Sequence, residues 1–357
     1  MKNKLLLTSA LAGSLMFNGI SLAQTTVSGN LDISFKAVST DGTKTTTNSD
    51  RYFGKESQIN VANKGKLNNG LDYAAGFSLE FDGNDGIAAG TTLQNTHNEN
   101  VYIDFISGNT TFTFGVDHIQ NSDRTLGTLI GEDAEDLADG IKGVTTSVSI
   151  SSVGSDPAGS YGAGVMQKTP VGTLSAWYTP KAGGSNAGVN TNDVASTITK
   201  DLGKGGYELG FVGDLGVKGL STHLFYNKQN KEIAAAQDQK GMNIGASYNV
   251  GQITAGINRK KVDYSTANLE GKQMEYSVAF AATKELSVGL NYSKAERNNA
   301  VSGKTGIADE TVKSIAVGYN MGPVVLVSQY GKVESMSGTA AAANDGDVLY
   351  LQLSTKF

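Results

Sequence analysis

Five carboxylates lie close together near the middle of the chain and have the clearest chemical potential in the sequence. They are Glu132, Asp133, Glu135, Asp136 and Asp139. Neighbouring carboxylates can supply oxygen ligands to calcium, although the spacing here is not that of an EF-hand loop. In a confined aqueous passage the same group would raise the local concentration of cations. A solvated surface loop is the third interpretation, and residue types alone leave all three open.

The histidines offer little support for catalysis. Of His97, His118 and His223, His118 comes nearest to a catalytic set, because it follows Asp117 and precedes Ser122. Ser122 lacks a G-x-S-x-G setting, and adjacent residues point to opposite faces of an extended chain. Nucleotide-binding, HExxH and zinc-type spacings are also missing from the sequence. We therefore predict no catalytic residue, no metal, no cofactor and no enzymatic activity.

Segments of alternating apolar and polar residues flank the stretch from Asp117 to about Ser160. In the clearest segment the apolar residues are Leu71, Tyr73, Ala75, Phe77, Leu79 and Phe81. Asp72, Ser78 and Glu80 occupy positions between them. A period of two indicates a β-strand with one apolar and one polar face.

Short turns alternate with long polar loops along the rest of the chain. Counting the alternating segments predicts sixteen strands when residues 193–200 are taken as a loop. Extra strands at 144–152 and 193–200 would give eighteen. Roughly 21 residues for each strand and its connection suits membrane strands of ~9–11 residues with alternately short and long connections.

The first residues resemble a secretory signal peptide. Lys2 and Lys4 precede a mostly apolar run from Leu5 to Ile20, and Ala23 ends a small-x-small cleavage site. We predict a signal peptide over 1–23 with cleavage near Ala23. The formal net charge of −5 then becomes about −7, which disfavours nucleic-acid binding. The chain also has no cysteine, so stability must come from an extended hydrogen-bonded framework.

The polar face of the predicted strands favours a membrane barrel. It carries Asp72, Glu80, Asp104, Thr113, Asn258 and Asn291, which are too polar for a packed core. A soluble sandwich also alternates, but tyrosines recur near strand ends, as in the aromatic girdles of membrane barrels. These tyrosines are Tyr178, Tyr226, Tyr248, Tyr292, Tyr319 and Tyr330. The predicted fold is all-β, a closed antiparallel transmembrane β-barrel.

The C-terminal segment is the most specific signal in the sequence. Leu349, Leu351, Leu353, Thr355 and Phe357 share one face, and Phe357 is the last residue. An alternating strand that ends on phenylalanine resembles the terminal signature of bacterial outer-membrane barrels, which their assembly machinery recognises. Phe357 is therefore our candidate membrane-assembly signal.

The sequence resembles the general diffusion porins of Gram-negative bacteria. The resemblance lies in the segments Thr26–Gly29, Asn69–Tyr73, Gly322-Pro323 and Gln329–Gly331, and in a long third loop before strands that lead to a terminal Phe357. It implies a sixteen-stranded barrel over 24–357, passive diffusion of small hydrophilic solutes and ions, and a homotrimer in outer-membrane lipid. It also implies that the third loop, 118–158, folds into the lumen as a constriction.

In such a porin the carboxylates of the third loop face basic side chains across the pore. The candidates for that basic wall are Lys36, Arg51, Arg259, Lys260 and Lys313. Arginine is scarce in this chain, with Arg124 and Arg297 as the remaining two. We therefore expect a mild cation preference that weakens at high salt. An outer-membrane adhesin or surface structural barrel without an open pore is the alternative.

Overall fold

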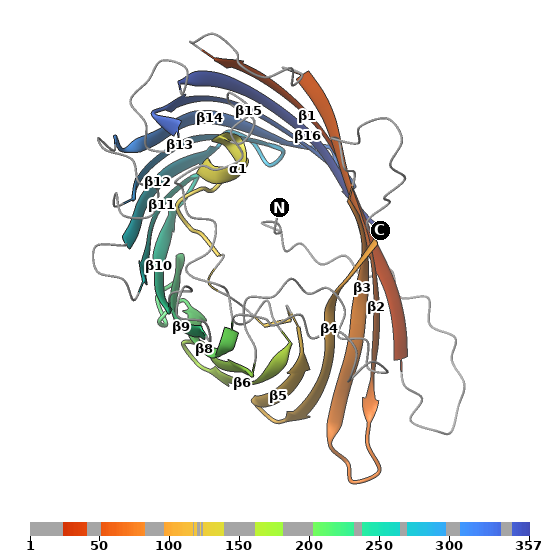
Figure 1. The fold of residues 1–357 in the computed structure, drawn as a ribbon. Helices are drawn as coiled ribbons and strands as arrows, with labels where there is room; N and C mark the ends of the chain where they lie inside the picture. The colour runs from red at the N-terminus through yellow and green to blue at the C-terminus, as the bar shows by residue number, and fades with distance from the viewer. Residues whose placement is uncertain are drawn as a thin grey trace, which may run out of the picture.

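A computed structural model shows a ring of antiparallel strands (Figure 1). It describes residues 24–40, 51–82, 96–116, 118–119, 122, 124–138, 161–180, 203–231, 238–264, 270–297, 308–336 and 345–357. The predicted signal peptide, 1–23, and the part of the predicted third loop from Asp139 to 158 lie outside the described residues. No described residue belongs to a helix long and apolar enough to cross a membrane.

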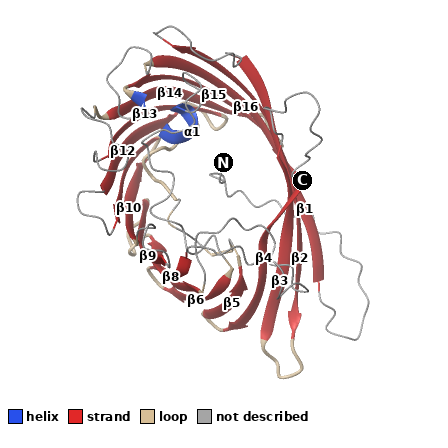
Figure 2. Ribbon diagram, viewed as in Figure 1, coloured by secondary structure: helices blue, strands red, loops and turns tan. Residues whose placement is uncertain are grey.

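Strands make up nearly all of the described chain (Figure 2). The first eight are β1 (Gln24–Thr40), β2 (Arg51–Lys66), β3 (Asp72–Asp82), β4 (Thr96–Ser107), β5 (Thr110–Gly115), β6 (Gly162–Thr169), β7 (Gly172–Thr179) and β8 (Gly203–Gly213). The second eight are β9 (Leu220–Lys231), β10 (Gln239–Val250), β11 (Ile253–Tyr264), β12 (Glu270–Ala281), β13 (Leu286–Arg297), β14 (Glu310–Asn320), β15 (Val324–Glu334) and β16 (Gly346–Lys356). A short helix, α1 (Ala134–Ala138), follows β5.

Each strand pairs with its neighbours in sequence, and β1 pairs with β16 to close the ring. Within the described ranges the barrel therefore has sixteen strands, which confirms the predicted fold. The eighteen-strand alternative is wrong, because β5 pairs directly with β6 and β7 with β8. Segments 144–152 and 193–200 themselves lie outside the described residues.

The two faces of the wall differ in polarity as the alternation predicts. Along β11, Asn258 and Lys260 are buried, whereas Ile257 and Arg259 are exposed. Other polar residues buried on the inner face are Gln58, Glu80, Asp104, Thr113, Gln273 and Gln329. Exposed apolar residues on the outer face include Ile103, Phe112, Leu174, Leu224, Val278 and Leu290. A closed ladder with an apolar exterior satisfies every backbone group of the wall in hydrocarbon.

Several strands extend beyond the alternating segments that mark them in the sequence. β2 begins at Arg51, although its clear alternation covers only the residues around Ile59 and Val61. β4 likewise begins at Thr96, five residues before its clear alternation starts at Val101. The first residues of both strands form ladder pairs, although the sequence there lacks a clear hydrophobic period.

The C-terminal residue completes the seam between the first and last strands. Phe357 and Gly29 exchange two backbone hydrogen bonds of 3.0 and 2.8 Å. A Cβ atom on Gly29 would lie 2.6 Å from the ring of Phe357 and 2.5 Å from the carbonyl oxygen of Gln58. The absence of a side chain at Gly29 therefore lets the terminal ring lie flat against β1.

We expect Gly29→Ala to weaken this seam. The added methyl group must displace the ring of Phe357 or the backbone of β2, which should lower the free energy of unfolding by about 1–3 kcal/mol. Urea unfolding in micelles, followed by the fluorescence of the single tryptophan, Trp177, measures the change. Val27→Leu, on the same face and 59% exposed, is the control and should stay within about 0.5 kcal/mol. Equal losses in the two variants would contradict the role of this packing.

Candidate functional site: the inner wall and the segment after β5

The described part of the segment after β5 lies against the inner face of the barrel wall. Figure 1 shows it and α1 inside the ring of strands. Its hydrogen bonds reach the wall in strand order, as the following pairs show. Ser122 contacts Glu208 and Asn227 on β8 and β9, Thr125 contacts Glu275 on β12, Ile130 contacts Asn291 on β13, Glu132 contacts Gln329 on β15, and Asp136 contacts Lys36 on β1. The segment thus follows the circumference of the wall.

Glycines on the inner face let this segment approach closely. A Cβ atom on Gly256 of β11 would overlap the carbonyl oxygen of Leu126. One on Gly289 of β13 would lie 3.1 Å from the Cβ of Ile130, and one on Gly331 of β15 would overlap Leu137. Because these glycines are on different strands, the sequence gives no local sign that they form one track.

Gln329 fixes the segment where it passes β15. Its side-chain oxygen accepts the backbone N–H of Glu132 at 2.7 Å, and its amide donates to the carbonyl oxygen of the same residue at 3.1 Å. Gly131, just before, has a φ of 88° and no side chain to collide with the Gln329 amide. Only glycine adopts this backbone conformation without strain, so the position depends on it.

Helix α1 is attached to the wall by a cap and by apolar contacts. Asp133 accepts the backbone N–H of Asp136 at 3.2 Å, which is the usual N-cap interaction. The apolar side of the helix packs on valines of β14, β15, β16 and β1. This cluster contains Val38, Ala134, Leu137, Ala138, Val312, Val333, Met336, Val348 and Tyr350. The helix was not predicted from the sequence, although Asp133 followed by good helix formers is a usable signal for its start.

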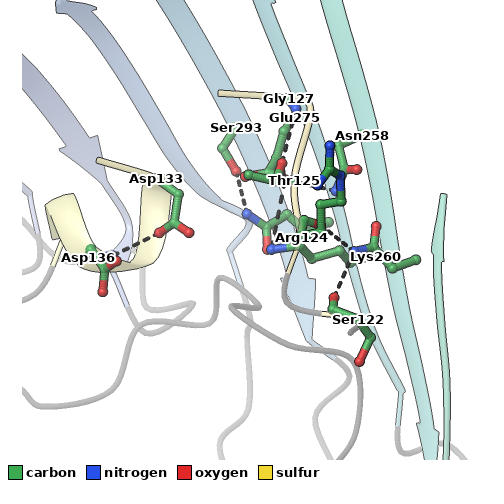
Figure 3. Close-up of polar contacts among 12 residues, drawn as sticks. Ser122, Arg124, Thr125, Gly127, Asp133, Asp136, Asn258, Lys260, Glu275 and Ser293 are labelled. Atoms are coloured by element: carbon green, nitrogen blue, oxygen red, sulfur yellow. Dashed lines mark hydrogen bonds and ion pairs between the residues drawn. The ribbon is translucent and has the colours of Figure 1, made fainter. Parts of the chain in front are cut away.

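A second anchor lies between Ser122 and Gly127 (Figure 3). The Thr125 hydroxyl donates to Glu275 at 2.8 Å and accepts the backbone N–H of Gly127 at 3.0 Å. The amide of Asn243 donates to the carbonyl oxygens of Ser122 and Arg124. Burial lowers the pKa of the Arg124 guanidinium, which nevertheless remains charged at neutral pH.

His118 and Ser122 do not form a catalytic pair. His118 stacks on Tyr102, with ring centroids 3.5 Å apart, and its Nε2 lies 3.0 Å from a carboxylate oxygen of Asp104. The Ser122 hydroxyl instead donates to Glu208 at 2.9 Å. Among the described residues, histidines and carboxylates form no cluster that could hold a metal ion.

The structure separates the five carboxylates of the cluster by role. Asp133 is buried as the helix cap, and Glu132 is held through its backbone. Asp136 is partly exposed, and its carbonyl oxygen accepts a hydrogen bond from Lys36. The side chain of Glu135 and the whole of Asp139 lie outside the described residues. Of the five carboxylates in this cluster, Glu132 and Asp136 are therefore the described ones that are not buried.

Two of the predicted basic residues lie on the inner face. Lys36 is buried beneath α1 and reaches the carbonyl oxygen of Asp136. Lys260 is 1% exposed, and its ammonium group lies 3.9 Å from a carboxylate oxygen of Glu275. Both lysines therefore contribute positive charge on the side of the wall that the segment covers.

The other three predicted basic residues belong to the outer face. Arg259 follows the strand alternation away from Lys260, and Lys313 shares the exposed side of β14 with Ile315. Arg51 is exposed at the first residue of β2, where it pairs with Ala37. Because successive side chains point to opposite faces, these three do not line the inner wall, which corrects the predicted assignment.

Comparison with known proteins gives one family. The model of the family described as Gram-negative porin matches residues 8–352. Similar solved structures include an anion-selective porin from Comamonas acidovorans, at 12% identity and a TM-score of 0.63, and a mutant porin of Rhodobacter blastica, at 13% and 0.60. Each alignment covers 94% of this chain and 100% of the other. OmpT of Vibrio cholerae is similar at 11% identity and 0.58, with coverages of 96% and 99%. No curated protein matches.

We expect Gly256→Val to lift the segment off the wall at Leu126. The added side chain should lower the free energy of unfolding by about 1–3 kcal/mol and expose the segment to protease. The control is Ala255→Val, one residue away but on the outer face, which should change the stability by less than about 0.5 kcal/mol. Limited proteolysis in micelles, with the cut sites mapped, measures the effect. Equal protection of the segment in both variants would contradict this anchoring.

Proposed function

The chain belongs to the Gram-negative porin family, and on that premise we propose that its outer-membrane barrel passes small hydrophilic solutes and ions with a mild preference for cations. The observation that carries the proposal is the polar inner face of a closed barrel, which water can fill while the outer face meets lipid. We further propose that a signal peptide is removed near Ala23, because a basic start, an apolar run from Leu5 to Ile20 and a small-x-small site precede Gln24.

The path of the segment after β5 supports its role as the constriction. It covers the inner wall from β8 round to β1, so that its thickness narrows the lumen on that side. Glu132 and Asp136, which are not buried, are the carboxylates best placed to meet a passing ion. Asp133 acts structurally as the cap of α1.

The inner faces of β2 to β4 add negative charge to the lumen. Glu56, Glu80 and Asp104 belong to the inner faces of β2, β3 and β4. Among the described residues, the basic side chains buried on the inner face are Lys36 and Lys260, and both lie under the segment, whereas Lys64, Lys66, Lys168 and Lys356 are exposed near the short-turn end of the same face. This distribution favours cations, because like charges around a confined passage concentrate counter-ions.

Barrels of this fold exist with the opposite preference. The porin from Comamonas acidovorans is described as anion-selective and shares this fold at 12% identity. Selectivity depends on side chains that the fold alone does not fix. Because the fold does not fix selectivity, the proposed cation preference rests on the individual side chains named in the two preceding paragraphs.

A homotrimer is the assembly that we propose for this barrel. Closed point-group symmetry is the usual form of soluble and membrane homo-oligomers. The outer face of the short strands β5 to β7 carries exposed apolar residues such as Phe112, Phe114 and Leu174. A second copy of the chain could cover such a face as well as lipid does.

Glu132→Gln with Asp136→Asn should reduce the cation preference, because two carboxylates leave the narrowed passage. We expect a reversal potential of the cation-selective sign for the wild type in a KCl gradient across a planar bilayer, smaller in the variant and smaller at high salt. Asp214→Asn with Glu285→Gln, in two exposed turns, removes the same charge elsewhere and should leave the potential unchanged. Anion preference in the wild type, or equal effects of the two pairs, would contradict the proposal.

Conductance and assembly together separate a pore from an adhesin. We expect the purified protein to form ohmic channels in planar bilayers and to migrate as an SDS-resistant trimer that dissociates on heating. Channels from a protein that is monomeric before heating would disprove the trimer and leave the channel intact. Folded barrels without conductance would instead favour the adhesin or structural alternative.

A further inference from the structure

Lysines form a row on the outer face of the barrel, at the end where the long loops connect the strands. Each strand from β9 to β15 contributes one. They are Lys228, Lys240, Lys261, Lys272, Lys294, Lys313 and Lys332. In membrane barrels the long loops are extracellular, so this row belongs to the outer-leaflet side. We call it the lysine row.

The level of the lysine row is that of lipid headgroups. On β9, β13 and β15 a tyrosine of the outer face precedes the lysine by two positions: Tyr226 before Lys228, Tyr292 before Lys294, and Tyr330 before Lys332. Two residues of a strand span about 7 Å. Aromatic girdles mark the boundary of the hydrocarbon, so the ammonium groups lie just beyond it.

Neighbouring strands place some of these lysines directly opposite one another. Lys261 faces Lys272, and Glu270 lies within 3.7 Å and 2.6 Å of their ammonium groups. Lys313 faces Lys332, and Glu334 lies 3.2 Å and 3.3 Å from theirs. Like charges directly opposite each other in a sheet are destabilising. In both pairs a carboxylate compensates by bridging the two lysines.

In the part of the chain that the structure describes, no carboxylate bridges the third pair. Lys228 on β9 faces Lys240 on β10 across the same outer face. Among the described residues neither lysine has an ion-pair partner, whereas the lysines of the other two pairs do. An external anion bound between Lys228 and Lys240 would supply the compensating negative charge that Glu270 and Glu334 supply at the other two pairs.

The outer surface on the hydrocarbon side of this pair suits the acyl chains of a lipid. Tyr207 and Tyr226 lie beside Lys228, with their ring centroids 6.1 Å apart. Leu224 and Ile244 are paired on the same outer face and are 45% and 46% exposed. The site therefore offers two cations at headgroup level above an aromatic and aliphatic surface.

We propose that Lys228 and Lys240 bind the phosphate group of an outer-leaflet lipid, whose acyl chains lie on Leu224 and Ile244. Two ammonium groups bind one phosphate through charge-assisted hydrogen bonds, and each lysine near a charged membrane surface strengthens lipid binding about fivefold. The occupant is a phosphorylated lipid, because a free phosphate would make no use of the apolar surface.

Native mass spectrometry of the folded barrel in uncharged micelles tests this site. The probe is lipid A with both phosphates, compared with the same glycolipid after dephosphorylation. We expect lipid A to bind the wild type, and Lys228→Gln with Lys240→Gln to weaken binding about tenfold or more. Lys313→Gln with Lys332→Gln is the matched control, because Glu334 already bridges that pair, and it should keep wild-type affinity.

Several outcomes would overturn the proposal. An equal loss of lipid A binding in both lysine variants would show a diffuse charge effect. Equal binding of lipid A and the dephosphorylated lipid would show that the phosphate is not recognised. Competition by inorganic phosphate at the lipid concentration would indicate a small-anion site. Loss of oligomers in the same spectra, with lipid retained, would assign the surface to a contact between copies. If the glutamine variant does not fold, Lys228→Arg with Lys240→Arg must retain lipid binding.

Discussion

The closed backbone ladder is the constraint on which the rest of this structure depends. In hydrocarbon no water can satisfy a free N–H or C=O group, so the strand that begins at Gln24 must pair with the strand that ends at Lys356. Closure fixes which side chains face inward, because register and alternation then apply round the whole ring. A polar lumen and an apolar exterior follow when that geometric condition is combined with the alternation of the sequence.

Much of the fold could be predicted from the sequence, because alternation is a local property. The segment from Leu71 to Phe81 shows its faces directly, and sixteen such segments give the barrel. The inward positions of Lys36 and Lys260 followed in the same way. Arg259 could have been excluded by the same rule, since it is adjacent to Lys260 and must point the other way. The start of β4 was missed because the residues before Val101 show no hydrophobic period in the sequence.

The candidate site could be predicted only in part, because its geometry depends on contacts between distant residues. The acidic cluster marks the segment after β5, but nothing near Glu132 in sequence indicates that Gln329 will hold its backbone. The glycines that accommodate the segment are spread over separate strands and become a track only when the barrel closes. Alternation assigns a face to each residue, and the pairing register decides which neighbours meet there.

The circumferential path of the segment has a mechanical consequence. A thin cylindrical wall of strands bends easily in the plane of its cross-section, since its hydrogen bonds run along the circumference. From Ser122 to Asp136 the segment is fastened in succession to strands between β8 and β1, so it acts as an internal half-hoop. The part of the ring from β8 round to β1 is thereby stiffened against flattening.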